Sequence, residues 1–303
     1  MTGTNNNQNS IADIAEMGQQ IRRDIIKMLL ISGSGHSGGP LGLADIFASL
    51  YFRILKRDSS NPNWPERDYF FLSAGHLAPV WYATLARAGY FPIEELSTLR
   101  KINTRLQGHP APAYTHGAPG VEVASGSLGQ GMSIAVGTCL GLRLDKKPNR
   151  VVVLHGDGEL DEGQVWESMM TAGHYGLDNL TAIVDRNFCQ IDNRTDKVME
   201  IEPLADKWRA FRWNVIECDG HNVEEFIGAM EEAQATRGKP SVVIAKTFMG
   251  RGVSFMEDNY KWHGVPPNQE QAKQALLEIP PTKFGDFITF EWEEEVPETA
   301  KQS

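Results

Sequence analysis

The 303-residue sequence has few cysteines, no long apolar run and fewer basic than acidic residues. Its three cysteines, Cys139, Cys189 and Cys218, lack the spacing of a zinc site and lie in or beside apolar runs, which indicates a reducing, cytoplasmic setting. No apolar stretch reaches the roughly 18 residues of a membrane span, so we expect no membrane partner. The net charge of -10 disfavours a nucleic-acid ligand, which would require a basic face.

The two ends of the sequence differ in composition from its centre. Residues 1–10 are polar and lack the basic and apolar regions of a signal peptide, so we expect a flexible N-terminus there. Residues 11–278 are expected to form one binding domain. The pair Pro280-Pro281 then interrupts the pattern, and residues 279–303 form a tail rich in aromatic and acidic residues. This tail is either an arm that packs on a partner chain or a disordered acidic end.

Apolar runs of strand type alternate with segments of helical period along the chain. The expected strands are residues 69–73, 151–154, 180–184, 214–217 and 241–247. The expected helices are residues 11–30, 43–55, 78–89, 92–101, 131–144, 163–175, 203–211, 223–235 and 269–277. The alternation predicts an α/β fold with a doubly wound, mainly parallel sheet and helices on both faces.

Oxygen-bearing side chains follow two of the predicted strands. The strand at 151–154 runs into Gly156-Asp157-Gly158, and the strand at 180–184 runs into Asp185-Arg186-Asn187. With the helix between them, these strands form a β-α-β unit whose carboxyl ends meet at one sheet edge, where such sheets bind ligands. The glycines let the backbone approach a phosphate, and the Asp157 carboxylate and Asn187 amide oxygen suit Mg²⁺. The pattern therefore predicts a site for Mg²⁺ and a diphosphate.

Glycine-rich loops elsewhere carry histidines. His36, His76, His109 and His263 each lie in a glycine- or proline-flanked loop, where an imidazole can bind hydroxyls or phosphates and move protons near neutral pH. The segment 120–131 is also glycine-rich and opens a helix, whose N-terminus favours an anion or a ring acceptor. Together these loops favour a polyhydroxylated, phosphorylated substrate. His155, His174 and His221 are poorer candidates.

These motifs, in this order, resemble the amino-terminal half of transketolase over residues 11–278. The motifs that carry the resemblance are Gly35-His36-Ser37-Gly38-Gly39-Pro40, Ser73-Ala74-Gly75-His76, Gly108-His109-Pro110, Gly126-Ser127-Leu128-Gly129-Gln130-Gly131, Gly156-Asp157-Gly158, Asp185-Arg186-Asn187 and Trp262-His263-Gly264. The resemblance implies a thiamine diphosphate-binding fold. It also implies transfer of a two-carbon ketol unit from a ketose phosphate to an aldose phosphate, because the cofactor acts as an electron sink.

The resemblance also implies roles for individual residues. Mg²⁺ would be bound by Asp157, Asn187 and the carbonyl of Cys189, and His36, His109 and His263 would act on the substrate. The implied cofactor-binding residues are His76, Gly126, Ser127, Leu128, Gly156, Asp157, Gly158, Asn187, Ile191 and His263.

Three departures from the family pattern bear on this reading. Phe188 stands where many thiamine enzymes have a second Asn, and Met249 stands where some relatives have a Lys near the diphosphate. The third departure is length, because transketolases of one chain are about twice as long. We therefore expect a split transketolase in the form of an α₂β₂ heterotetramer, active only when a separate pyrimidine-binding subunit is present.

Two other functions stay open at this point. The same cofactor could pass the two-carbon unit to a non-standard acceptor, either a lipoyl or acyl-carrier thiol or a specialised sugar. A non-catalytic homologue is the remaining alternative, which the retained Asp157, Asn187 and loop histidines disfavour.

Overall fold

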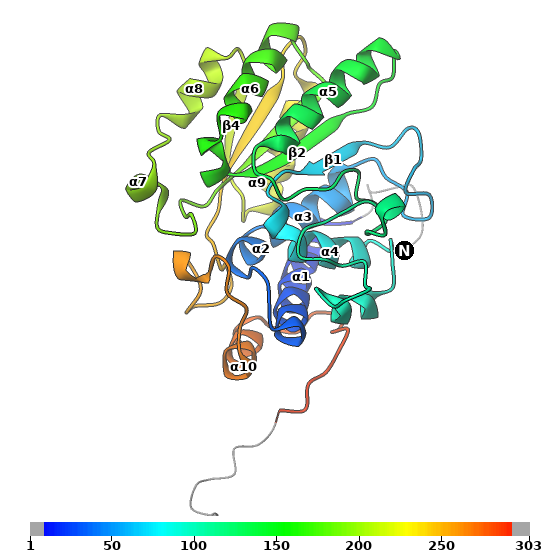
Figure 1. Ribbon diagram of the computed structural model, residues 1–303, viewed down its shortest axis with the longest axis vertical. Helices are drawn as coiled ribbons and strands as arrows, with labels where there is room; N and C mark the ends of the chain where they lie inside the picture. The colour runs from blue at the N-terminus through cyan, green and yellow to red at the C-terminus, as the bar shows by residue number, and fades with distance from the viewer. Residues whose placement is uncertain (1–8, 293–303) are drawn as a thin grey trace, which may run out of the picture.

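The computed structural model describes residues 9–292, which form an α/β fold around one parallel sheet (Figure 1). The strands are β1 (Tyr69–Leu72), β2 (Val151–Gly156), β3 (Leu180–Arg186), β4 (Asn214–Asp219) and β5 (Ser241–Lys246). They lie in the order β1-β2-β3-β5-β4, and every neighbouring pair is parallel. This confirms the predicted fold class.

Helices cover both faces of the sheet, because side chains that point to either face of the central strands are buried. One face packs against α5 (Gln130–Leu144), α6 (Gly163–Tyr175) and α8 (Leu204–Ala210). The other packs against α1 (Ile11–Ser32), α3 (Ala44–Ser49), α4 (Ala78–Arg87) and α9 (Val223–Ala235). In β2, Val151 and Val153 join the first core, whereas Val152 and Leu154 join the second.

The remaining helices are short or peripheral: α2 (Gly38–Gly42), α7 (Thr195–Val198) and α10 (Gln269–Glu278), together with 3₁₀ turns at Gly75–Leu77, Ile93–Thr98, Ala113–Thr115, Gly158–Asp161 and Tyr260–Trp262. None of the helices in residues 9–292 is both long and apolar enough to cross a membrane.

Two predicted helices differ from the structure. The helix expected at residues 92–101 is wrong, because only the 3₁₀ turn Ile93–Thr98 forms there. Leu99 is extended and Arg100 has a φ of 58°, which ends any helical path. The helix expected at residues 43–55 is shorter than predicted, since α3 ends at Ser49 and a π-helical turn follows at Leu50–Ile54.

The beginning of the predicted tail packs on the same chain. Asp286 accepts a hydrogen bond from Arg23 Nε at 2.8 Å and lies 3.0 Å from Lys27 Nζ, both on α1. Phe284 and Trp292 pack against the core. Over residues 279–292 the chain therefore lies against its own first helix, and the disordered end is wrong for these residues. The predictions for residues 1–8 and 293–303 fall outside the described residues.

At the N-terminal boundary of the described residues, Ser10 is part of the start of the first helix. Ser10 caps α1, because its hydroxyl accepts from Asp13 N at 3.1 Å and the Asp13 carboxylate accepts from Ser10 N. The cap of the first helix therefore lies one residue before Ile11.

Candidate functional site

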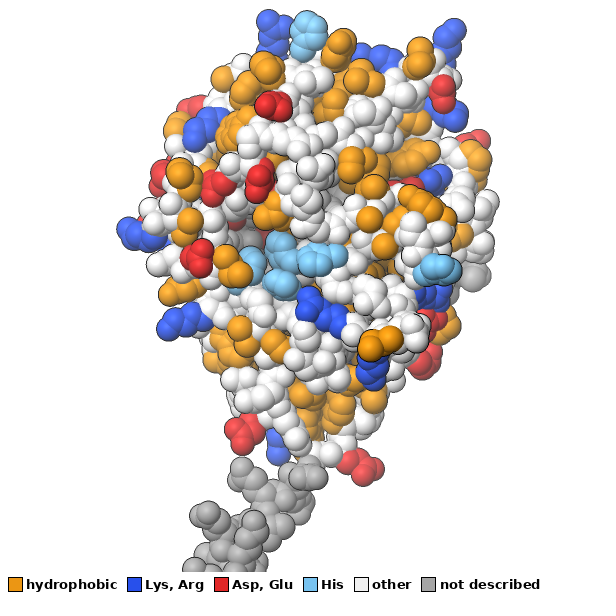
Figure 2. All heavy atoms as spheres, in the orientation of Figure 1, with side chains coloured by type: hydrophobic (Ala, Val, Ile, Leu, Met, Phe, Trp, Pro, Cys, Tyr) orange, Lys and Arg blue, Asp and Glu red, His pale blue; other side chains and the backbone are white. Residues whose placement is uncertain are grey.

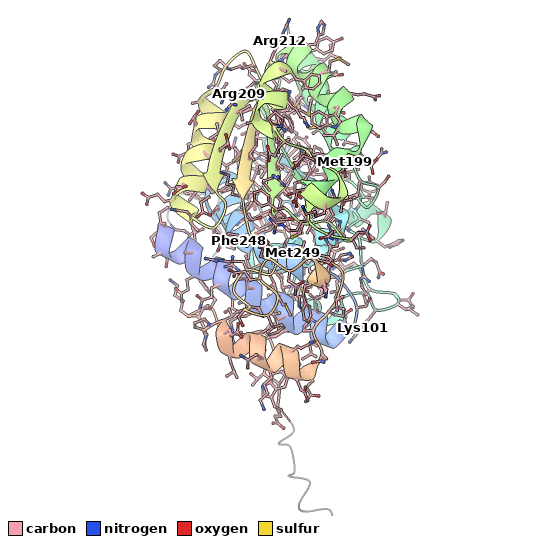
Figure 3. All side chains as sticks on the ribbon, turned by 90° about the vertical axis from the view of Figure 1, so that its left-hand side faces the viewer. Lys101, Met199, Arg209, Arg212, Phe248 and Met249 are labelled. Carbon is pink, nitrogen blue, oxygen red and sulfur yellow. The ribbon has the colours of Figure 1, made fainter. Side chains whose placement is uncertain are left out.

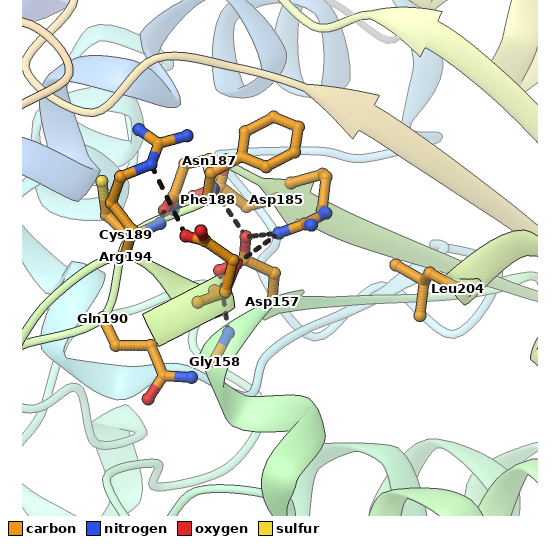
Figure 4. A network of polar contacts seen from close by, with 12 residues as sticks. Asp157, Gly158, Asp185, Asn187, Phe188, Cys189, Gln190, Arg194 and Leu204 are labelled. Atoms are coloured by element: carbon orange, nitrogen blue, oxygen red, sulfur yellow. Dashed lines mark hydrogen bonds and ion pairs between the residues drawn. The ribbon is translucent and has the colours of Figure 1, made fainter. Parts of the chain in front are cut away.

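The carboxylate of Asp157 lies at the carboxyl end of β2, buried and held by three donors (Figure 4). Its Oδ1 accepts from Gly158 N at 2.8 Å, and its Oδ2 accepts from Phe188 N at 2.7 Å and from Arg186 Nη1 at 2.8 Å. A carboxylate offers about four acceptor positions, so one position is left, on Oδ1. Burial nevertheless raises the pKa of Asp157 to about 6, against the opposing effect of Arg186.

The side chain of Asn187 is oriented at the adjacent end of β3. Its Nδ2 donates to Asp185 Oδ2 at 2.7 Å, and its Oδ1 accepts from Cys189 N at 2.9 Å. Because the backbone N–H of Cys189 only donates, its contact fixes which end of the Asn187 amide is oxygen. Asp185 is itself bound by the Thr247 hydroxyl, and burial raises the pKa of Asp185 to about 7. Asp157 and Asn187 are therefore brought together as predicted.

Arg186 and Phe188 flank Asn187 in the sequence. Both support the Asp157 carboxylate, a role that the motif did not reveal. The Arg186 guanidinium bridges Asp157 and Glu202, at 2.8 and 2.9 Å, and lies 3.9 Å over the Phe188 ring. Phe188 adopts a φ of 63°, in the left-handed region that Asn tolerates and an aromatic residue rarely enters. The departure from Asn at position 188 thus keeps the backbone shape and its donation to Asp157.

Glu159 is a further buried residue that sequence analysis missed. It lies just after the Gly-Asp-Gly turn, where it accepts from Gly129 N at 2.7 Å and from the Ser73 hydroxyl. The same hydroxyl accepts from Gly131 N at 3.0 Å. Burial raises the pKa of Glu159 to about 7. This network fixes the glycine-rich loop at the start of α5 to the ends of β1 and β2.

Three of the predicted histidines meet in one cluster. The ring centroids of His36 and His76 are 5.0 Å apart, those of His76 and His263 are 5.0 Å apart, and those of His36 and His263 are 5.6 Å apart. His109 lies beside Gly126, where an added Cβ would come within 3.2 Å of its ring. Figure 2 shows histidine side chains gathered in the middle of one face, beside a basic side chain.

Burial keeps these histidines neutral at pH 7. It lowers the pKa of His36 to about 4 and that of His76 to about 3, with repulsion from His263 as a further cause. The pKa values of His109 and His263 are also lowered, again by burial. The Nδ1 atoms of His36 and His263 and the hydroxyl of Ser125 are buried without a hydrogen-bond partner in residues 9–292. Buried polar atoms normally have partners, so this histidine cluster, called the cleft below, is suited to a polar ligand.

Arg100 is a cation at this cleft that sequence analysis also missed. Its Nη1 donates to Ser34 Oγ at 2.7 Å, and a Cβ on Gly108 would lie 2.7 Å from its Nε. The guanidinium thus lies between the loops of His36 and His109, and its charge contributes to the lowered pKa of both, after burial. No ion pair among residues 9–292 includes Arg100. It is therefore available to an anion.

Other predicted site residues stand apart from these contacts. Ile191 is 64% exposed and Leu128 is 36% exposed, and Ser127 and Gly126 are exposed as well. No group of three His, Cys, Asp or Glu side chains in the described part of the chain could hold a metal ion. The predicted metal ligands do not require such a group, because they comprise one carboxylate, one amide oxygen and one carbonyl.

Together these features define an α/β domain with a buried carboxylate, an oriented amide oxygen and a histidine cluster at the carboxyl ends of its strands, where such sheets bind ligands. Comparison with known proteins agrees. Residues 14–284 match the family of the transketolase thiamine diphosphate-binding domain. The chain belongs to this family, as a thiamine diphosphate-dependent transketolase-family subunit, and the members named below are transferases.

Similar proteins include chains that are named as transketolase subunits. The chain is 44% identical to the 6-deoxy-6-sulfo-D-fructose transketolase subunit SqwG of a Clostridium species, over 88% of this chain and 96% of that protein. It is 38% identical to one of the apulose-4-phosphate transketolase subunits, that of Phocaeicola vulgatus, over 85% of this chain and 90% of that protein. A solved transketolase of Campylobacter jejuni matches with a TM-score of 0.83 and 32% identity over 89% of this chain. The chain spans only 43% of that transketolase.

Proposed function

We propose that this chain is the diphosphate-binding subunit of a two-chain transketolase that moves a ketol unit from a ketose to an aldose. Residues 11–278 form its binding domain, and a pyrimidine-binding subunit completes it in an α₂β₂ assembly. The observation that carries the proposal is the pairing of Asp157 and Asn187 beside a cluster of neutral histidines with unpaired nitrogen atoms.

The oxygen atoms at the strand ends fit Mg²⁺ as ligands. Asp157 keeps one acceptor position on Oδ1, the Asn187 oxygen is held in place by Asp185, and the Cys189 carbonyl follows directly. Burial raises the pKa of the Cys189 thiol to about 11, so its carbonyl, not its sulfur, suits the ion. Gly156, Gly158 and His76 would contact the diphosphate, and Gly126, Ser127, Leu128 and Ile191 would contact the rest of the cofactor. Met249, which stands where some relatives have a Lys, would add no charge near the diphosphate.

Thiamine diphosphate, when bound, supplies the carbanion-stabilising chemistry of ketol transfer. This chain's contribution is the set of His36, His109 and His263 beside it. Since each is neutral at pH 7, each can donate a hydrogen bond to a sugar hydroxyl and take up a proton that leaves it. The pocket thus orients the sugar and moves protons at its oxygen atoms.

We infer that the sugars carry a terminal anion. Arg100 supports this inference because it faces the cleft without a carboxylate partner in the described chain. The names of two relatives, which act on a sulfonated fructose and on apulose 4-phosphate, support an anionic and specialised sugar. A sulfonate and a phosphate both suit a guanidinium, so a panel of both sugar classes must separate them.

An uncharged face on α5 supports the proposal that this chain binds a partner chain. From Gln130 to Leu142 this helix has no charged residue, although Gly137 and Gly141 face outward and Leu144 is 83% exposed. A solvent face normally carries charged side chains, and glycine inside a helix costs about 1 kcal/mol relative to alanine. Apart from the backbone of α5 itself, no atom among residues 9–292 lies within 4 Å of either glycine's Cβ position. Because α5 begins within the loop at residues 126–131, this uncharged face lies next to the proposed cofactor-binding loop.

The test of the assembly is reconstitution. The chain is purified alone and with candidate pyrimidine-binding subunits, and transfer is assayed with Mg²⁺ and thiamine diphosphate across ketoses that carry phosphate or sulfonate. We expect transfer only from the mixture. Equal turnover by the chain alone would refute the two-chain reading.

The test of the metal site is titration calorimetry of thiamine diphosphate into the assembly, with and without Mg²⁺. Asp157→Ala should abolish the Mg²⁺-dependent part of the affinity, because it removes the ionised oxygen ligand. Asp161→Ala is the matched control, since Asp161 is an exposed carboxylate on the turn after Gly158. Unchanged Mg²⁺ dependence in Asp157→Ala would contradict the assignment.

A further inference from the structure

The loop of His36 rests on a short segment that follows β5. Gly250 N donates to Gly38 O at 2.8 Å. A Cβ on Gly38 would lie 2.5 Å from Met249 Cγ, and one on Gly42 would lie 2.8 Å from the carbonyl oxygen of Phe248. These short distances leave no room for residues 38–42 to move closer to residues 248–250. Residues 248–250 therefore set the position of residues 38–42.

The loop of His263 is anchored on the same segment. Asp258 N donates to the Met249 carbonyl at 2.9 Å, and a Cβ on Gly250 would lie 2.3 Å from the Met256 carbonyl oxygen. The two loops also join each other, because the Ser37 hydroxyl donates to Val265 O at 2.7 Å. A shift of residues 248–250 would therefore displace both histidines.

His221, outside the cleft, holds this segment in place. Phe248 N donates to His221 Nε2 at 2.8 Å, and His221 Nδ1 lies 3.2 Å from Asp45 Oδ2. Since a backbone N–H only donates, Nε2 is the unprotonated acceptor and Nδ1 carries the hydrogen that bonds Asp45. Arg22 pairs with Asp45 in turn, through Nη1 at 2.9 Å. The side chains of Arg22, Asp45 and His221 are at most 10% exposed.

We propose that His221 is a positioning residue for the substrate-binding histidines, and this inference rests on the proposed function. It fixes the Phe248 amide and, through residues 248–250, the loops of His36 and His263. The His221 ring also stacks on Phe248, with centroids 6.0 Å apart and planes at 10°. Figure 3 shows Phe248 and Met249 next to each other, between the strands and α1.

Two conservative variants separate the two contacts of the ring. In His221→Gln, the side-chain amide reaches the position of Nε2 and can still accept from Phe248 N. In His221→Asn, the shorter amide reaches the position of Nδ1 and retains only the contact with Asp45. Both side chains are polar and smaller than imidazole, so a purely structural role would affect them alike.

Hydrogen exchange on the purified chain tests the positioning directly. We expect the Phe248 and Gly250 amides to exchange about tenfold faster in His221→Asn and near the wild-type rate in His221→Gln. With the partner subunit, His221→Asn should lower kcat about tenfold with little change in cofactor affinity, and His221→Gln should retain most of kcat. Wild-type exchange rates in His221→Asn, or equal loss of kcat in both variants, would overturn the proposal.

One measurement needs no variant. The ¹⁵N chemical shifts of His221 in the wild-type chain at neutral pH should report a protonated Nδ1 and an unprotonated Nε2, and the opposite tautomer would refute the contact. The exchange and ¹⁵N measurements use the chain alone. An inactive wild-type assembly with the expected exchange rates would therefore count against the proposed function and in favour of the positioning.

Discussion

Replacement of His155 by leucine should make the chain both more stable and less sensitive to acid. His155 lies in β2 with no exposed surface, and neither of its ring nitrogen atoms has a hydrogen-bond partner among residues 9–292. Its ring lies 6.5 Å from that of Trp208, in the core under α6 and α8. A buried polar group without a partner costs about 1–3 kcal/mol, so His155→Leu should gain a similar amount at pH 7.

The acid sensitivity follows from the pKa. Burial lowers the pKa of His155 from 6.5 to about 4, so the unfolded chain binds a proton between these values that the folded chain does not. The stability associated with neutral His155 is therefore complete above pH 6.5 and is lost as the pH falls towards 4. At about 1.4 kcal/mol per pKa unit, the loss between pH 7 and pH 5 is about 2 kcal/mol.

Urea unfolding of the chain at pH 7 and pH 5, followed by circular dichroism, measures both effects. We expect His155→Leu to lose about 2 kcal/mol less than the wild type between the two pH values. His174→Leu is the control, since His174 is an exposed residue on α6. An equal pH-dependent loss in His155→Leu and wild type would refute the reasoning.

Three other substitutions test parts of the structure. Asp286→Ala should destabilise the chain by about 3 kcal/mol in urea unfolding, because Arg23 and Lys27 stay buried without their carboxylate, and a destabilisation below about 1 kcal/mol would contradict this. Ser73→Ala should cost about 2 kcal/mol in the same assay, since Glu159 and Gly131 N each lose a buried partner, whereas an unchanged midpoint would exclude the network. Gly137→Arg should weaken binding of the partner chain by about tenfold or more in analytical ultracentrifugation, because it charges the α5 face. Gly228→Arg, on an equally open glycine of α9, should leave association unchanged, and equal effects would reject α5 as the contact.

The sequence predicted β2, β3 and β5 well because each is a short apolar run buried on both faces, a pattern that depends little on distant residues. It also placed Asp157 and Asn187 together, because parallel strands end at one edge. The local pattern predicted a helix wrongly at residues 92–101. Helix-forming residues occur there, but Arg100 adopts a left-handed conformation that the tertiary structure imposes.

The supporting polar residues could not be predicted in the same way. Glu159 and Arg186 look like ordinary surface charges in the sequence, and only the fold shows that both are buried and paired. His221 is a poor candidate from the sequence alone, because its partners are 27 and 176 positions away. Contacts of this range leave no local signature.

The spacing of His36, His76 and His263 limits how many protons the cleft can carry. With ring centroids 5.0–5.6 Å apart, one charged imidazole raises the energy of charging a second, and burial already lowers the pKa of each ring, so the cluster carries at most one proton at a time near neutral pH. A ketol transfer consumes and releases no proton overall. Under the proposed function, the cluster must therefore pass on a proton taken from one sugar oxygen before it accepts another.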